Sequence, residues 1–195
     1  GDGGRIETSG HRLLTDGVDG SAAAPAGESG QWLFDPTNVS VVGAGSSAGG
    51  TNDGVSTLTA SSIEALLNGG TSVTITTSSG GGDLGNISVD TAIMKSLGAG
   101  DVTLTLRAAN VISLNSDITH TGGSGELNLV FDADNDTAAA TAGTSPVRDG
   151  AGIVILEANL SSGGGDITFG GTAVGGSTGG DLYVGGGSDA VTITT

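Results

Sequence analysis

The most constraining feature of this sequence is a series of short segments in which aliphatic residues alternate with polar ones. Each segment is only three to five residues long and is bounded by Gly, Ser, Asn or Asp, which favour turns. Alternation with a period of two is typical of strands that have one buried face and one solvated face. We therefore expect an all-β chain of many short strands. The segments are 39–42, 73–76, 87–89, 102–106, 112–114, 127–131, 153–156, 166–169, 182–184 and 191–193.

A triplet of glycine, acidic residue and aliphatic residue recurs at or just ahead of these segments. The triplets begin at Gly82, Gly100, Gly125, Gly165 and Gly180. A near-repeat of about 20 residues with short strands and glycine corners is typical of solenoids. Each repeat would form one coil, and its strands would pair in parallel with the coils above and below. The sequence thus predicts a single β-solenoid segment over residues 1–195, as part of a longer chain or fibre.

The composition agrees with a narrow coiled interior. Glycine takes 39 positions and aromatic residues make up only 3%. Small aliphatic side chains fill a thin core, and corners need residues that tolerate positive φ. Abundant glycine and a net charge of −16 also favour disorder. The clustered aliphatic segments and the mean hydropathy of +0.14 favour the folded alternative.

Charge and residue usage exclude several classes of function. With 5 basic residues against 21 acidic ones, the surface repels phosphate backbones, so no nucleic-acid partner is expected. No apolar run approaches the roughly 18 residues needed for a membrane span. Cysteine is absent, which removes disulfides, thiolate catalysis and cysteine-based zinc sites. Residues 1–5 contain no basic stretch followed by an apolar core, so we expect no secretory signal in this chain.

Two segments depart from the strand pattern. Residues 60–70 predict one short helix near 62–68, capped by Ser61 or Ser62, with Glu64 in its first turn and a stop at Asn68-Gly69. A long gap between triplets predicts a loop insertion near 132–150.

Three carboxylates at alternate positions begin this insertion. Clustered oxygens suit a hard cation, so Asp132, Asp134 and Asp136 are candidate calcium ligands. The segment is not an EF-hand, because Thr137 and Gly143 stand where that loop needs Gly and Glu. A solvated acidic loop without calcium is the alternative.

Other motifs favour structural roles over catalysis. Residues 80–85 match G-x-G-x-x-G, but a strand pattern follows instead of the helix that a dinucleotide site requires, so we expect a corner. We expect His11 and His120 to lie at the surface or in turns. No pair of carboxylates stands out for glycoside hydrolysis, and the few basic residues are scattered. The chain is therefore predicted not to be an enzyme.

One stretch is more specific than the rest. Gln31-Trp32-Leu33-Phe34-Asp35-Pro36 holds the only Trp and an Asp-Pro turn, and we expect Trp32 and Phe34 to anchor a bend before the strand at Val39. With the glycine-led element at 4–11 and segments 62–68, 71–75, 85–89 and 104–112 in order, the chain resembles the filamentous haemagglutinin-like adhesins of bacterial two-partner secretion. The resemblance covers about residues 3–170.

This resemblance implies a right-handed parallel β-helix that is exported unfolded through an outer-membrane secretion pore. It implies an extracellular, cell-surface fibre that mediates adhesion or cell contact, with this chain as a segment of the shaft. The implied partners are the pore during export, neighbouring coils or units end to end, and a host or cell-surface receptor. A carbohydrate-binding or polysaccharide-acting β-helix is the alternative, and it predicts exposed aromatic side chains lining a groove.

Overall fold

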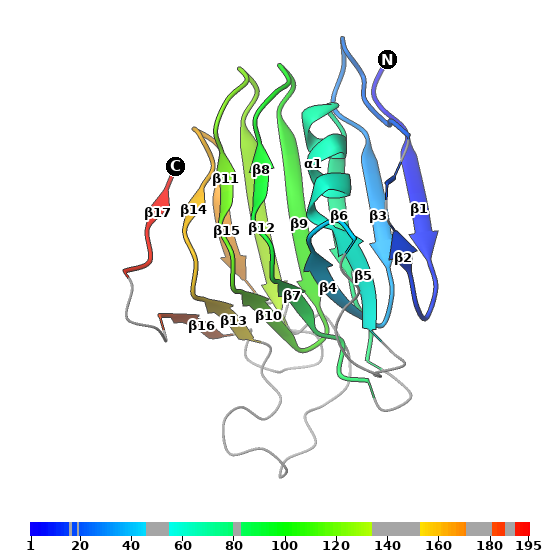
Figure 1. Ribbon diagram of the computed structural model, residues 1–195. Helices are drawn as coiled ribbons and strands as arrows, with labels where there is room; N and C mark the ends of the chain where they lie inside the picture. Colours follow the sequence, from blue (N-terminus) through cyan, green and yellow to red (C-terminus); the bar gives the residue numbers. More distant parts are fainter. Residues whose placement is uncertain are drawn as a thin grey trace.

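In a computed structural model the chain is mostly β, with parallel sheets and one helix (Figure 1). This confirms the predicted all-β class. Every strand pairing among the described residues is parallel. The structure describes residues 1–15, 17–18, 20–45, 55–79, 83–133, 153–170, 181–185 and 190–195.

The strands form three sheets, in which each strand is hydrogen-bonded to the strands named next to it. The first sheet contains β1 (Arg5–Ser9), β3 (Gln31–Asp35), β6 (Ser72–Thr76), β9 (Val102–Ala108), β12 (Leu127–Ala133) and β15 (Ile167–Gly170). The second contains β16 (Asp181–Val184), β13 (Ile153–Leu156), β10 (Val111–Leu114), β7 (Ile87–Val89), β4 (Asn38–Val42), β5 (Val55–Thr59) and β2 (Leu14–Thr15). The third contains β17 (Ile193–Thr194), β14 (Leu160–Ser161), β11 (Ile118–His120) and β8 (Ile93–Lys95).

From β6 onward the chain visits the first, second and third sheets in that order, four times. We call each visit to the three sheets a pass. Figure 1 shows the passes side by side, with the two termini at opposite ends of the row. The N-terminal part differs, because β5 lies between β4 and β2 in the second sheet. The helix α1 (Ala60–Asn68) then packs against β8, the edge strand of the third sheet.

Alternation along each strand builds a core of aligned side chains. In the first sheet Phe34, Ile75, Leu106, Phe131 and Phe169 are successive register partners. The first four are at most 1% exposed. The Phe131 and Phe169 rings stack with centroids 5.2 Å apart. Aliphatic columns from the other two sheets join the same core cluster, so the burial of apolar surface is continuous along the row of passes.

Most predicted strands are confirmed, with corrections at particular places. Trp32 and Phe34 lie in β3 with their side chains buried. The chain bends directly after β3, where it passes from the first sheet to β4 of the second, so the predicted bend is confirmed and only the strand that carries its anchors was not predicted. The triplet at Gly82 opens no strand, because Leu84 is 61% exposed and β7 begins at Ile87. The triplet at Gly180 opens β16 of the second sheet, whereas those at 100, 125 and 165 precede strands of the first sheet.

The predicted helix and insertion also need adjustment. The helix starts at Ala60, and its N-cap is Thr59, whose hydroxyl accepts the N–H of Ser62; the first turn holds no acidic residue. The predicted stop is confirmed, since Gly69 is the C-cap. Asp132 and Ala133 still belong to β12, so the insertion starts later than predicted, and its remainder lies outside the described residues. In the described ranges, no helix is long and apolar enough to cross a membrane.

Candidate functional site

The candidate calcium ligands are only partly within the described residues. Asp132 is buried at 9% exposure, and its Oδ2 lies 3.0 Å from the Arg107 Nε on the neighbouring strand. The two residues are register partners, so the ion pair spans β9 and β12. A calcium ion at Asp132 would therefore compete with a guanidinium. Asp134 and Asp136 lie outside the described residues, so the proposed calcium site stays a prediction.

We predict that titration with millimolar calcium gives the same heat for the wild type and for Asp132→Asn, because Asp132 does not bind the ion. The carboxylate is already paired with Arg107, and displacing a partly buried guanidinium costs free energy that one ligand cannot return. Isothermal titration of the wild type and of Asp132→Asn measures this directly. A calcium-binding heat that Asp132→Asn abolishes would restore the calcium site.

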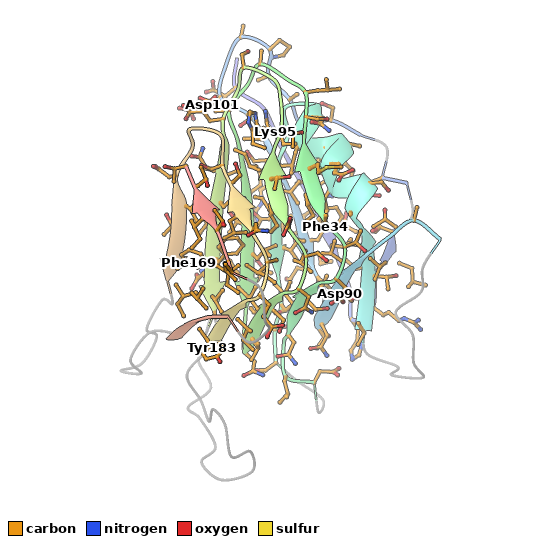
Figure 2. The ribbon with its side chains drawn as sticks, turned by 60° about the vertical axis from the view of Figure 1, so that its left-hand side comes forward. Phe34, Asp90, Lys95, Asp101, Phe169 and Tyr183 are labelled. Atoms are coloured by element: carbon orange, nitrogen blue, oxygen red, sulfur yellow. The ribbon has the colours of Figure 1, made fainter. Side chains whose placement is uncertain are left out.

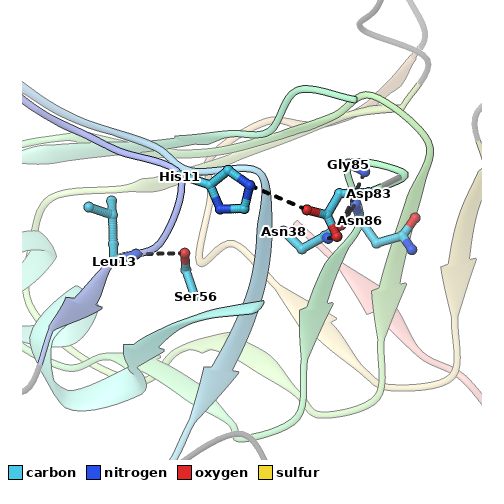
Figure 3. A network of polar contacts seen from close by, with 7 residues as sticks. All are labelled: His11, Leu13, Asn38, Ser56, Asp83, Gly85 and Asn86. Carbon is cyan, nitrogen blue, oxygen red and sulfur yellow. Dashed lines mark hydrogen bonds and ion pairs between the residues drawn. The ribbon is translucent and has the colours of Figure 1, made fainter. Parts of the chain in front are cut away.

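The region of the G-x-G-x-x-G match forms part of a polar corner. Asp83 Oδ2 lies 3.7 Å from His11 Nε2, and Asp83 Oδ1 accepts a hydrogen bond from Asn38 Nδ2 at 2.9 Å (Figure 3). Asn38 Oδ1 in turn accepts the backbone N–H groups of Gly85 and Asn86. The strand β7 follows, so this segment lacks the helix that would bind a pyrophosphate. His11 is exposed, as predicted.

This corner is one example of a pattern along the row of passes. A side-chain oxygen at a corner, at the start of a strand or at the end of α1 accepts a backbone N–H further along the row, which satisfies a donor near the end of a strand ladder. The acceptors, with the residues whose N–H they bind, are Asn38 (Gly85, Asn86), Asn68 (Ser96, Leu97), Asn86 (Val111), Asp101 (Glu126), Asp117 (Asn159), Asn128 (Asp166) and Asn159 (Thr192).

Asp90, which follows β7, joins the N-terminal strand β4 and the next pass to its own pass through its carboxylate. Its Oδ2 accepts hydrogen bonds from the hydroxyls of Ser40 and Ser88, and its Oδ1 accepts one from Asn115 Nδ2, each at 2.7 Å. Burial by itself raises the pKa of Asp90, but these three hydrogen bonds outweigh it and lower the pKa below the usual value. The charged form of Asp90 is therefore the one that the fold stabilises.

We expect Asp90 to contribute to acid sensitivity. Because its folded pKa is lowered, its contribution to the free energy of unfolding is present above pH 3.8 and is lost as pH falls through the lowered pKa. Urea unfolding between pH 2 and pH 5 should show a smaller loss of stability for Asp90→Asn than for the wild type. Equal losses in both proteins would contradict this assignment.

A polar column lies inside the third sheet, where the sequence pattern predicts none. Lys95 and His120 are register partners, and Ser162 follows β14 on the next pass. Lys95 and Ser162 are fully buried. The Lys95 Nζ donates to the carbonyl oxygens of Gly125 at 2.7 Å and Leu97 at 3.2 Å. His120 lies in β11 and is half-buried, so it is a strand residue that is partly exposed and not a turn residue.

The two titratable groups of this column, Lys95 and His120, differ in their hydrogen bonding. Burial lowers the pKa of Lys95, and the negative charge of Asp101 opposes that shift. Figure 2 places Lys95 and Asp101 at the same end of the molecule. The Nε2 of His120 is buried and has no hydrogen-bond partner. Period-two alternation could have found the column, because Lys95 and His120 each stand two residues after an isoleucine that faces the core.

A groove of about 830 Å³ lies at the same end as Lys95. Its walls come from the segment 23–29, the C-terminal end of α1 and the corner that precedes β9. Among the described residues that line it, Glu28 and Asp101 carry the charge and none is aromatic. This composition offers hydroxyl and carboxylate oxygens but no flat ring for stacking on a sugar.

The last strands of the second and third sheets, β16 and β17, leave core-facing side chains exposed. Leu182, Val184 and Ile193 are 43–49% exposed. Their register partners on the preceding pass, Val154, Leu156 and Leu160, are 0–3% exposed. The strands β15, β16 and β17 are also edge strands, so one side of each carries backbone groups without a strand partner among the described residues.

Compared with models of known protein families and with curated proteins, the chain shows no significant match.

Proposed function

We propose that the chain is a right-handed parallel β-solenoid and works as a shaft segment of a bacterial cell-surface adhesin. The observation that carries the proposal is the fixed order in which four consecutive passes visit three parallel sheets, with register-aligned core columns. Parallel strands joined by crossovers are right-handed in nearly all proteins. Each pass would then add about 4.8 Å along the axis.

Several features support a mechanical role over catalysis. The hydrogen bonds between passes run along the axis, both in the ladders and at the corners, so each pass is tied to the next at its strands and between them. A net charge of −16 keeps neighbouring fibres apart. No group of three or more potential metal ligands occurs in the part of the chain that the structure describes. We expect the chain to be exported through an outer-membrane pore and to be located outside the cell. We expect it to have no enzymatic activity.

Surface display tests the adhesin proposal. A non-adhesive bacterium that displays the chain should adhere to cultured epithelial cells several-fold better than one displaying a Gly125→Ala variant, which we expect to be strongly destabilised. The Gly100→Ala variant is the folded control and should adhere like the wild type. Equal adhesion of all three strains would refute an adhesive role of this segment.

The groove near Glu28 and Asp101 is the feature that favours the alternative, a carbohydrate-binding module. A glycan array separates the two functions. The shaft proposal predicts that the wild type and Asp101→Asn give the same result on the array, with no saccharide bound through the groove. A saccharide bound by the wild type and lost in Asp101→Asn would favour the carbohydrate-binding alternative.

A further inference from the structure

We propose that the groove beside Asp101 binds a linear polyamine, whose ammonium groups pair with the carboxylates of Glu28 and Asp101. The groove has a volume of about 830 Å³ and is lined by the segment 23–29, the C-terminal end of α1 and the corner that precedes β9. The first and last of these segments touch, because the Ser29 hydroxyl donates a hydrogen bond to the carbonyl oxygen of Asp101 at 2.9 Å. The two acidic residues therefore come from segments in direct contact.

The charge along the groove is negative and accessible. Glu28 and Asp101 are both exposed, and no lysine or arginine occurs among the described residues that line the groove. Lys95 lies at the same end of the molecule (Figure 2), but its side chain is fully buried and its Nζ donates to the carbonyl oxygens of Leu97 and Gly125. A cation from solution can therefore reach both carboxylates without displacing a basic side chain of the described lining.

The end of α1 adds to the negative potential. Asn68, Gly69 and Gly70 line the groove, Gly69 is the C-cap, and the last turn of this nine-residue helix holds no basic residue. Aligned peptide dipoles leave a partial negative charge at a helix C-terminus, where a cation is stabilised. Two carboxylates and a helix end together favour a ligand that carries more than one positive charge.

The remaining walls suit the alkyl part of such a ligand. Ala23, Ala24, Pro25 and Ala99 contribute small apolar surfaces to the groove. Methylene groups between two ammonium groups gain free energy when they lie against such surfaces, out of water. A metal ion needs a tighter set of ligands, and no group of three or more potential metal ligands occurs in the described ranges. An alkyl chain with separated ammonium groups therefore matches the groove best.

Isothermal titration of the full chain with spermidine tests the proposal. About 150 mM NaCl screens the weak attraction between distant exposed charges. We expect saturable binding to the wild type. The Kd should rise about three- to fivefold in Glu28→Gln and in Asp101→Asn, and at least about tenfold in the double variant, because each substitution removes one charge without changing the size of the side chain. Butylamine, which carries one ammonium group, should bind several-fold more weakly than spermidine.

Glu157→Gln is the control for the loss of charge alone. Glu157 is exposed between β13 and β14 and does not line the groove, so this variant should keep the wild-type Kd within about twofold. Equal weakening by the three single substitutions would overturn the proposal, because the attraction would then come from the net charge of −16. No binding at millimolar spermidine would also overturn it. Tetralysine that binds more tightly than spermidine, with the same dependence on Glu28 and Asp101, would assign the groove to basic peptides instead.

Discussion

Gly125→Ala is expected to destabilise the protein by about 2–4 kcal/mol. A Cβ at this position would overlap the carbonyl oxygen of Gly100 and would lie 2.8 Å from the carbonyl carbon of Ala99. These are backbone atoms of the preceding pass, so no rotation of a side chain can relieve the overlap. Gly125 also supplies the carbonyl oxygen that accepts Lys95 Nζ. The substitution therefore separates two passes at a corner that also holds the buried lysine.

Gly100 provides a matched control for this prediction. It stands at the equivalent corner one pass earlier, and a Cβ there would meet no atom within 4 Å. Gly100→Ala should change the free energy of unfolding by less than about 0.5 kcal/mol. Urea denaturation of both variants, followed by far-ultraviolet circular dichroism, measures the difference. Equal stability of the two variants would mean that the passes are not in contact at this corner.

Phe131→Ala is expected to cost about 3–5 kcal/mol. Phe131 is fully buried, and its register partners are Leu106 on one side and Phe169 on the other. Its ring stacks on Phe169, so truncation removes both the buried area and the aromatic contact. The cavity would lie between two strands whose backbones are fixed by ladders on both sides, which limits how far the site can collapse.

Val130→Ala is a control that distinguishes the loss of core packing from a loss of strand propensity. It lies on the same strand but on the opposite face, and it is only half-buried. Val130→Ala should cost less than about 1 kcal/mol. Urea midpoints of the two variants should therefore differ widely. Similar midpoints would place Phe131 outside the core and would contradict the alternation on which the fold rests.

Strands with dense aliphatic alternation were predictable, whereas several strands with fewer aliphatic residues were not. Segments such as 102–106 and 127–131 carry enough alternation to identify β9 and β12 from sequence. The strands β8 and β11 were missed because each contains one isoleucine, and the residue two positions later, Lys95 or His120, is a polar side chain on the same face. The strand β3 was missed because its Trp and Phe, in a chain with few aromatics, were interpreted only as anchors of the bend that follows and not as strand residues.

The polar interactions between passes could not be derived from residue type alone. Asn and Asp favour turns in any sequence, so their positions at corners were expected. Which N–H each one accepts depends on the register between passes, and unequal lengths of chain separate the register partners. The same dependence hid the column of Lys95 and His120, because a lysine and a histidine outside a recognised strand are normally assigned to the surface.

Spin-label distances along the first sheet test most directly whether the passes stack in sequence order. Glu7, Leu33, Thr74, Thr105, Val130 and Thr168 are successive register partners. They alternate with the core-facing residues, and the chain has no native cysteine to interfere with labelling. With one label at Glu7→Cys, the distances to labels at Thr105→Cys, Val130→Cys and Thr168→Cys should be about 14, 19 and 24 Å, rising by one strand spacing each time. A distance to position 168 no longer than the distance to position 105 would contradict the stacked order.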